Sequence, residues 1–180
     1  EHPRIKAISF TGGTATGKHI AATAGPMFKK LSLELGGKNP NIIFEDADIE
    51  KAIKTTVNTS FLNQGEICLC GSRLLVHESL YDKVKEEMVK RAKALVVGDT
   101  QDEKTRVGAI VSKPHYEKVL SYIELAKQEG GRVLAGGEAL HPEGFESGWF
   151  IAPTVIEGLG PACRTNTEEI FGPVITLMSF

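Results

Sequence analysis

Hydrophobic residues follow two different periods along this chain, and each period predicts one type of secondary structure. Short apolar or alternating runs predict strands at residues 5–10, 29–35, 39–46, 72–78, 132–137, 149–158 and 173–180. Apolar residues at helical spacing predict helices at residues 48–61 and 79–95. Small residues before Gly25-Pro26 predict a helix at residues 14–24, and a further helix is expected from Ser112 to about Glu129, where Gly130-Gly131 ends it. Strands and helices that alternate in this order are typical of a layered α/β fold with mostly parallel strand pairing.

The strand-like segments also indicate how the chain is divided. The stretch GGKNP, residues 36–40, places glycine and proline between two predicted strands and is the best candidate for a domain boundary. We therefore expect one domain over residues 1–35 and another over residues 36–180. Both ends of the chain are strand-like, and a terminal strand normally needs neighbours, so we expect a segment of a longer polypeptide.

Composition favours a globular protein that handles a small molecule. The 180 residues are 41% hydrophobic and 24% charged, with a net charge of −2. These values do not predict binding to nucleic acid or to an anionic membrane surface. No apolar run reaches the roughly 20 residues of a membrane span, and the start EHPRIK does not resemble a secretory signal. The three cysteines are expected to be free thiols in a cytoplasmic protein.

The stretch FTGGTATGKHI, residues 10–20, places a glycine-rich turn between a predicted strand and a predicted helix. Free N–H groups at such a helix start favour a phosphate oxygen. The pattern falls one residue short of a triphosphate-binding loop, because His19 replaces the Ser or Thr that holds magnesium. A dinucleotide pyrophosphate needs no such hydroxyl and is therefore favoured, while a tight turn without a ligand is the structural alternative.

Cys68 is the candidate nucleophile. It lies in the turn-rich stretch NQGEICLCGSR, residues 63–73, between a predicted helix and a predicted strand, where a side chain can face a cleft. Backbone N–H groups in such a loop can stabilise a thiolate and an oxyanion formed by its attack. In the structural alternative, Cys68 and Cys70 are small buried hydrophobes. A metal site and a Cys68–Cys70 disulfide are disfavoured, and in an extended segment the two side chains would point in opposite directions.

Glu34 is the candidate general base. It lies at the carboxyl end of an otherwise apolar predicted strand, directly before the glycine pair. Strand ends of this kind hold ligand sites in α/β sheets. Partial burial is the setting in which a carboxylate can take a proton from water near neutral pH, and we expect it here. In the structural alternative, backbone groups or Lys38 satisfy the carboxylate.

Four stretches occur in one order along the chain: FTGGTATG, LELGGKNP, FLNQGEICLCGSR and EEIFGPV. Together they resemble the aldehyde dehydrogenase superfamily, the NAD(P)-dependent enzymes that oxidise aldehydes to carboxylic acids. The resemblance extends over essentially all of residues 2–180, and NQGEICLCGSR is similar to members that act on muconic semialdehydes.

The resemblance implies a three-layer α/β fold. Residues 1–35 would end a Rossmann-like NAD(P)-binding domain, and residues 36–180 would form most of a mainly parallel α/β catalytic domain. Segments that complete the adenosine site and the oxyanion hole would precede Glu1, so the 180-residue segment is expected to be inactive by itself. The complete protein would be a homo-dimer or homo-tetramer.

The resemblance also implies roles for individual residues. Cys68 would attack the aldehyde to form a thiohemiacetal and, after hydride loss to the nicotinamide, a thioester. Glu34 would activate the water that releases the acid. Gly12 and Gly13 would form the turn under the pyrophosphate of NAD, with NADP as the alternative cofactor.

In the last of the four stretches, Glu169 would bond the nicotinamide ribose and Phe171 would pack near the nicotinamide. A solvated loop acid and a core aromatic are their structural alternatives. Gly13 replaces the Ser of many relatives, which removes a helix cap worth about 1 kcal/mol. The resemblance implies no metal ion.

Two other functions stay open from the sequence. A cysteine hydrolase would use Cys68 and Glu34 without a cofactor, but no histidine partner is evident, because His77 and His115 are expected to be surface residues. A structural or binding module would keep the fold without a reactive thiol. Cofactor-dependent oxidation and selective thiol labelling distinguish the three.

Overall fold

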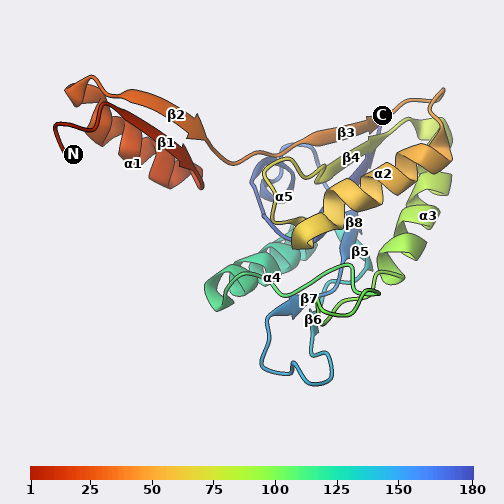
Figure 1. The fold of residues 1–180 in the computed structure, drawn as a ribbon. Helices are drawn as coiled ribbons and strands as arrows, with labels where there is room; N and C mark the ends of the chain where they lie inside the picture. Colours follow the sequence, from red (N-terminus) through yellow and green to blue (C-terminus); the bar gives the residue numbers. More distant parts are fainter. The chain divides into compact units, whose positions relative to one another are not determined.

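The computed structural model describes residues 1–180, which divide into two compact units, Glu1–Gly37 and Lys38–Phe180. Each unit has its own secondary structure and is described separately (Figure 1). The division falls within the glycine and proline stretch that the sequence indicates as a boundary. The assignment of the units to a cofactor domain and a catalytic domain stays a prediction.

The first unit is a strand–helix–strand motif, as the sequence predicts. Its elements are β1 (Ala7–Thr11), α1 (Thr14–Ala24), the 3₁₀ turn η1 (Gly25–Met27) and β2 (Lys30–Glu34). Strands β1 and β2 pair in parallel, with Thr11 opposite Glu34. A Cβ at Gly17 would lie 2.5 Å from the side chain of Leu35, so glycine at this position allows the helix to approach the strand end closely.

The second unit contains a five-stranded sheet in the order β3-β4-β9-β8-β5. These strands are β3 (Pro40–Ile43), β4 (Arg73–Val76), β9 (Val174–Ser179), β8 (Thr154–Glu157) and β5 (Arg132–Ala135). All neighbours pair in parallel except β5, which is antiparallel to β8. The last strand of the chain, β9, lies between β4 and β8, so both of its edges are paired.

Helices cover both faces of this sheet, which gives three layers (Figure 1). The helices of the unit are α2 (Ile49–Phe61), α3 (Tyr81–Lys93), α4 (Lys113–Gln128) and the short α5 (Arg164–Thr167). Consecutive residues of β8 face opposite layers: Val155 packs with α2 and α3, whereas Ile156 packs with α4. Residues Ile175 and Val174 of β9 divide in the same way. The nearly continuous apolar sequence of these strands therefore reflects burial on both faces.

The predicted strand 149–158 is two strands in the structure, β7 (Phe150–Ile151) and β8. Pro153 lies between them, and its missing N–H group is the physical reason for the break. Strand β7 pairs with the short strand β6 (Ala139–Leu140), while β8 joins the main sheet. Neither β6 nor α5 was predicted from the sequence.

The helix boundaries agree better with the sequence. Asp48 caps α2, because its carboxylate accepts a 3.1 Å hydrogen bond from the Lys51 N–H, as its position predicts. Helix α3 begins at Tyr81, two residues later than expected, after the 3₁₀ turn η3 (Glu78–Leu80). None of the helices is both long enough and apolar enough to cross a membrane.

Candidate active site

A tight turn carries the chain from helix α2 into the loop that holds Cys68. The 3₁₀ turn η2 (Leu62–Gly65) places Asn63, Gln64 and Gly65 at φ values of 51°, 57° and 71°. A Cβ at Gly65 would overlap the carbonyl oxygen of Gly172, so only glycine fits at this left-handed position. The turn therefore brings NQGEICLC against EEIFGPV, two stretches far apart in the sequence.

Asn39 holds the cysteine loop, residues 66–71, from the other side. Its side-chain amide donates hydrogen bonds of 2.5 Å to the carbonyl oxygen of Cys68 and 3.2 Å to that of Cys70. The Cys70 N–H in turn donates to the carbonyl oxygen of Ile67 at 3.0 Å, so the loop is folded into a turn. The loop that the sequence predicts here is confirmed, and because the segment is not extended, the opposite orientation of Cys68 and Cys70 in an extended chain does not apply.

The two cysteines of the loop lie in different environments. Cys68 is half-buried and Cys70 is buried, and both thiols are free. Burial raises the pKa of Cys70, which keeps it protonated and unreactive at neutral pH. Cys68 is therefore the more accessible of the two.

One stripe of helix α4 holds the loop that contains Glu169 and Phe171. The ring nitrogen Nε2 of His115 lies 2.5 Å from the Phe171 carbonyl oxygen, and Lys118 donates a 3.0 Å hydrogen bond to the Glu169 carbonyl oxygen. One turn further along the helix, the Tyr122 hydroxyl donates to a carboxylate oxygen of Glu168 at 2.5 Å. These helix residues are three and four positions apart, so they share one face.

Helix α4 also packs closely against Gly172, at the end of this loop. A Cβ at Gly172 would lie 2.6 Å from a methyl group of Val119, so glycine is needed for the close approach. Phe171 itself adopts a left-handed φ of 62°, which is uncommon for a residue other than glycine. Packing against α4 therefore fixes a loop conformation that local preference disfavours.

Glu66 joins the cysteine loop to this arrangement. Its carboxylate accepts a 3.2 Å hydrogen bond from the Val111 N–H and lies 3.5 Å from Nε2 of His115. Only 7% of the Glu66 side chain and 16% of the His115 side chain are exposed. The cysteine loop and the loop that contains Phe171 thus both contact the imidazole ring of His115.

The first unit carries Glu34 together with the glycine turn. The Gly12 N–H donates to the backbone carbonyl oxygen of Glu34 at 3.0 Å, which joins the turn to the end of β2. Gly13 is the N-cap of α1 and provides no side-chain cap. The expectation that Glu34 is partly buried is wrong for this chain: its side chain is exposed. Alternation along β2 places Leu33 and Leu35 on the half-buried face and Glu34 on the other.

Comparison with known proteins identifies the group to which this chain belongs. The model of the aldehyde dehydrogenase family matches residues 1–180. The chain belongs to the aldehyde dehydrogenase family. The resemblance that the four sequence stretches indicate is therefore confirmed.

Curated relatives and solved structures agree with this membership. The chain is 46% identical to 2-aminomuconic semialdehyde dehydrogenase of Mus musculus and 43% identical to 4-trimethylaminobutyraldehyde dehydrogenase of Oryzias latipes, over 99% of its length. It covers 37% and 36% of those relatives, so it spans little more than a third of their length. The betaine aldehyde dehydrogenase of Staphylococcus aureus in complex with NAD+ is 40% identical, with a TM-score of 0.96 over 99% of this chain and 35% of that one.

Three residues of this aldehyde dehydrogenase chain that contribute to the site geometry, Asn39, Glu66 and His115, were not predicted as site residues. His115 was expected to be a surface residue, and this expectation is wrong. Its signal in the sequence is its position on α4, where it shares a face with the apolar Val119. For Asn39 the signal is its place directly after the glycine pair and Lys38, but its partners are 29 and 31 residues away.

Lys38, directly before Asn39 in the sequence, carries a buried basic group. Its amino group is buried with no hydrogen-bond partner. Burial, and then the positive charge of Arg73, lower the pKa of Lys38 to about 8, while the charges of Cys163 and Glu169 act in the opposite direction. Lys38 is therefore partly neutral at mildly alkaline pH.

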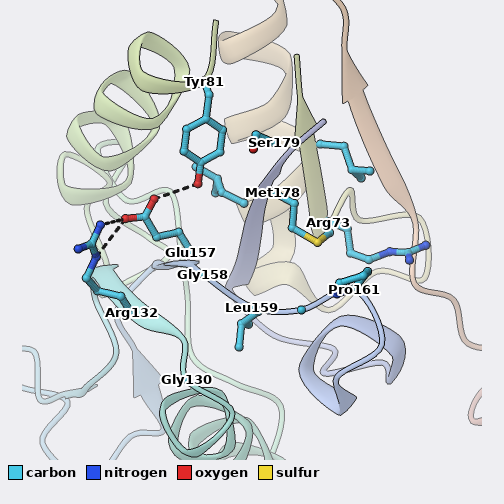
Figure 2. Close-up of a pocket in the computed structure, with 13 residues that line it drawn as sticks. Arg73, Tyr81, Gly130, Arg132, Glu157, Gly158, Leu159, Pro161, Met178 and Ser179 are labelled. Atoms are coloured by element: carbon cyan, nitrogen blue, oxygen red, sulfur yellow. Dashed lines mark hydrogen bonds and ion pairs between the residues drawn. The ribbon is translucent and has the colours of Figure 1, made fainter. Parts of the chain in front are cut away.

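A cavity of about 880 Å³ lies elsewhere in the second unit and contains none of the predicted site residues. Figure 2 shows the Glu157 carboxylate in this cavity, where it accepts hydrogen bonds from the Tyr81 hydroxyl at 2.9 Å and from the Arg132 guanidinium. Burial opposes ionisation of Glu157, but these hydrogen bonds outweigh it and hold its pKa below the usual value. Tyr81 and Arg132 therefore stabilise the buried charge of Glu157, and these three polar side chains need no catalytic role to explain their presence. No group of three or more His, Cys, Asp and Glu side chains is placed to hold a metal ion.

Proposed function

We propose that this chain carries the nucleophile and the general base of an NAD(P)-dependent aldehyde dehydrogenase, Cys68 and Glu34. The observation that carries the proposal is the accessible Cys68 in a loop held by Asn39 on one side and by the Gly65–Gly172 contact on the other. A nucleophile held in one conformation needs little reorganisation when it attacks. Family membership supports the reaction class.

The chemistry of the chain's own residues follows from this assignment. The Cys68 thiolate attacks the aldehyde carbon, and a C–S bond forms while the carbonyl oxygen becomes an oxyanion. Once the carbon has been oxidised, the product is a thioester on Cys68. Glu34 takes a proton from water, the resulting hydroxide attacks the thioester, and the carboxylic acid leaves as the Cys68 thiolate is regenerated.

The nicotinamide cofactor, when bound, supplies the hydride acceptor for this oxidation. The first unit fits the pyrophosphate of such a cofactor. Helix α1 has neither a side-chain cap nor an acidic residue in its first turn, so its first N–H groups remain available to an anion. No neighbouring atom lies within 4 Å of the Cβ position of Gly13, which leaves space at the helix start. We assign Gly12 and Gly13 to the pyrophosphate, and Glu169 and Phe171 to the nicotinamide riboside, with NAD favoured over NADP.

A small aldehyde is the proposed substrate. The relatives named above are dehydrogenases of 2-aminomuconic semialdehyde and 4-trimethylaminobutyraldehyde, and both compounds belong in a substrate panel. Leu69, next to the nucleophile, is 77% exposed and offers an apolar surface to the carbon chain of a substrate.

The proposed assembly is a homo-dimer or homo-tetramer. Ile42 and Phe44 are 49% and 56% exposed at and just beyond β3, the parallel edge strand of the main sheet. Exposed apolar side chains at a sheet edge are typical of a surface that another chain or segment covers. Light scattering of the complete polypeptide measures the assembly directly, and a monomer would contradict it.

The deciding experiment uses the whole translated polypeptide that contains these 180 residues. We expect it to reduce NAD+ when an aldehyde is added, and to lose this activity in the Cys68→Ser variant. Ester cleavage that does not require NAD+, without aldehyde oxidation, would instead identify a cysteine hydrolase. A protein with neither activity and no selective labelling of Cys68 by iodoacetamide would be a structural or binding module. The 180-residue chain by itself is expected to show no turnover.

A further inference from the structure

We propose that His115 is a positioning residue that holds the cysteine loop and the loop Glu168–Gly172 in one relative arrangement, through its contacts with Glu66 and Phe171. This inference rests on the proposed function, because those two loops carry the assigned nucleophile and the assigned nicotinamide contacts. His115 itself touches neither of the reacting groups that we assign. Its contribution would be to keep Cys68 at a fixed place relative to Phe171.

The ring geometry defines what the imidazole does. Nε2 lies 2.5 Å from the Phe171 carbonyl oxygen, and an oxygen of this kind only accepts, so Nε2 carries the proton. The Glu66 carboxylate lies 3.5 Å from the same nitrogen. The ring edge also contacts the Phe171 ring, with centroids 5.7 Å apart and planes at 68°. One N–H group therefore faces acceptors from both loops.

Glu66 and Phe171, the two acceptors, lie close to the proposed nucleophile and at the proposed nicotinamide contact. Glu66 is two residues before Cys68, and its second contact, the Val111 N–H, anchors it to the segment that precedes α4. Phe171 has a left-handed φ of 62°, a conformation that requires surrounding contacts to persist. A hydrogen bond on the carbonyl oxygen of that residue restrains its backbone directly.

Other contacts of α4 do not join the two loops. Lys118 and Tyr122 bond to Glu169 and Glu168, which lie in only one of them. Tyr122 therefore offers a matched control, because Tyr122→Phe removes one hydrogen bond to the loop Glu168–Gly172 and none to the cysteine loop.

The test compares His115→Leu, His115→Gln and Tyr122→Phe in the complete polypeptide. Leucine has no donor, whereas the glutamine amide can donate to both acceptors. In His115→Leu we expect hydrogen exchange to rise about tenfold in residues 62–71 and 168–172 together, the scale of one lost hydrogen bond. His115→Gln should restore protection in both loops, and Tyr122→Phe should raise exchange in residues 168–172 alone.

Kinetics provide the second measurement. His115→Leu should lower kcat about tenfold with KM for the aldehyde within about twofold, and His115→Gln should recover most of the loss. Unchanged exchange in either loop, or equal effects of leucine and glutamine, would overturn the positioning role. If His115→Leu does not fold, His115→Asn takes its place, since asparagine is too short to reach both acceptors. A wild-type protein without aldehyde oxidation refutes the proposed function, and the exchange data still decide the role of His115.

Discussion

The side-chain amide of Asn39 donates a 2.5 Å hydrogen bond to the carbonyl oxygen of Cys68, across 29 residues of sequence. Asn39 lies directly before β3, so the cysteine loop is fastened to the beginning of an edge strand as well as to its own flanking elements. The bond leaves the thiol untouched and restrains the backbone that carries it. The nucleophile that we propose is therefore placed by the side chain of a residue from another motif.

The roles of the two cysteines in the loop can be separated by substitution. Cys68→Ser in the complete polypeptide should lower aldehyde oxidation by more than about a thousandfold, the scale of losing a nucleophile on which every later step depends. Cys70→Ser, the matched control, should change kcat by less than about fivefold, because Cys70 is buried away from the proposed chemistry. Steady-state rates measure both. Activity that survives in Cys68→Ser would exclude Cys68 as the nucleophile.

Asn39→Asp should destabilise the protein by about 1–3 kcal/mol. Aspartate has the same shape but no N–H group, and its charge would face the two carbonyl oxygens that Asn39 now bonds. The control Asn58→Asp, at an exposed position of α2, should cost less than about 1 kcal/mol, the range for an acid near a helix end. Denaturant unfolding of the complete polypeptide gives both values, and equal losses would argue against a holding role for Asn39.

Alanine substitutions at Gly65 and Gly144 separate the energetic cost of steric overlap from the cost of a left-handed backbone conformation. Both have a left-handed φ, 71° and 79°, but only Gly65 has a neighbour where a Cβ would lie. Gly144→Ala should therefore cost about 1–2 kcal/mol from the backbone conformation alone. Gly65→Ala should cost more than about 4 kcal/mol, because Gly172 must also move. Thermal unfolding measures the stability of both variants. Similar losses of stability would mean that Gly65 and Gly172 are not in close contact.

The ion pair between Arg164, the first residue of α5, and Glu168, directly after that helix, predicts a pH dependence. Hydrogen bonds from Arg164 and then from Tyr122 hold the pKa of Glu168 at about 2, below its usual value of 4.5. A carboxyl group whose pKa is lower in the folded state stabilises the fold above the unfolded pKa, and this contribution is lost as the pH falls through the folded pKa. Between about pH 5 and pH 2, the wild type should lose more stability than Arg164→Met.

Urea midpoints at several pH values measure that difference. Tyr122→Phe should have a smaller effect than Arg164→Met, because Arg164 makes the larger contribution to the low pKa of Glu168. Parallel acid-loss curves for the wild type and Arg164→Met would show that the ion pair does not contribute.

The sequence by itself determined most of the secondary structure and the candidate chemistry. Hydrophobic periodicity located α2, α3 and the buried strands, because burial of one face or of both leaves a pattern within a few residues. The side chain of Asp48 also indicated the start of α2, since capping is a local interaction. Cys68 and the glycine turn could be named as candidates for the same reason: the chemistry proposed for them belongs to short stretches of chain.

Tertiary structure alone decided which of these stretches meet. The partners of His115 lie 56 residues away at Phe171, and on the other side in the loop of Glu66, and no periodicity links those positions. It also decided that Glu34 is on the exposed face of a two-stranded sheet and that Pro153 separates two strands with different partners. Contacts of this kind depend on how layers pack and on where a missing Cβ permits close approach, as at Gly65 and Gly172. Such packing is a property of the assembled chain, because each contact requires both partners to be brought into place by elements that are distant in sequence.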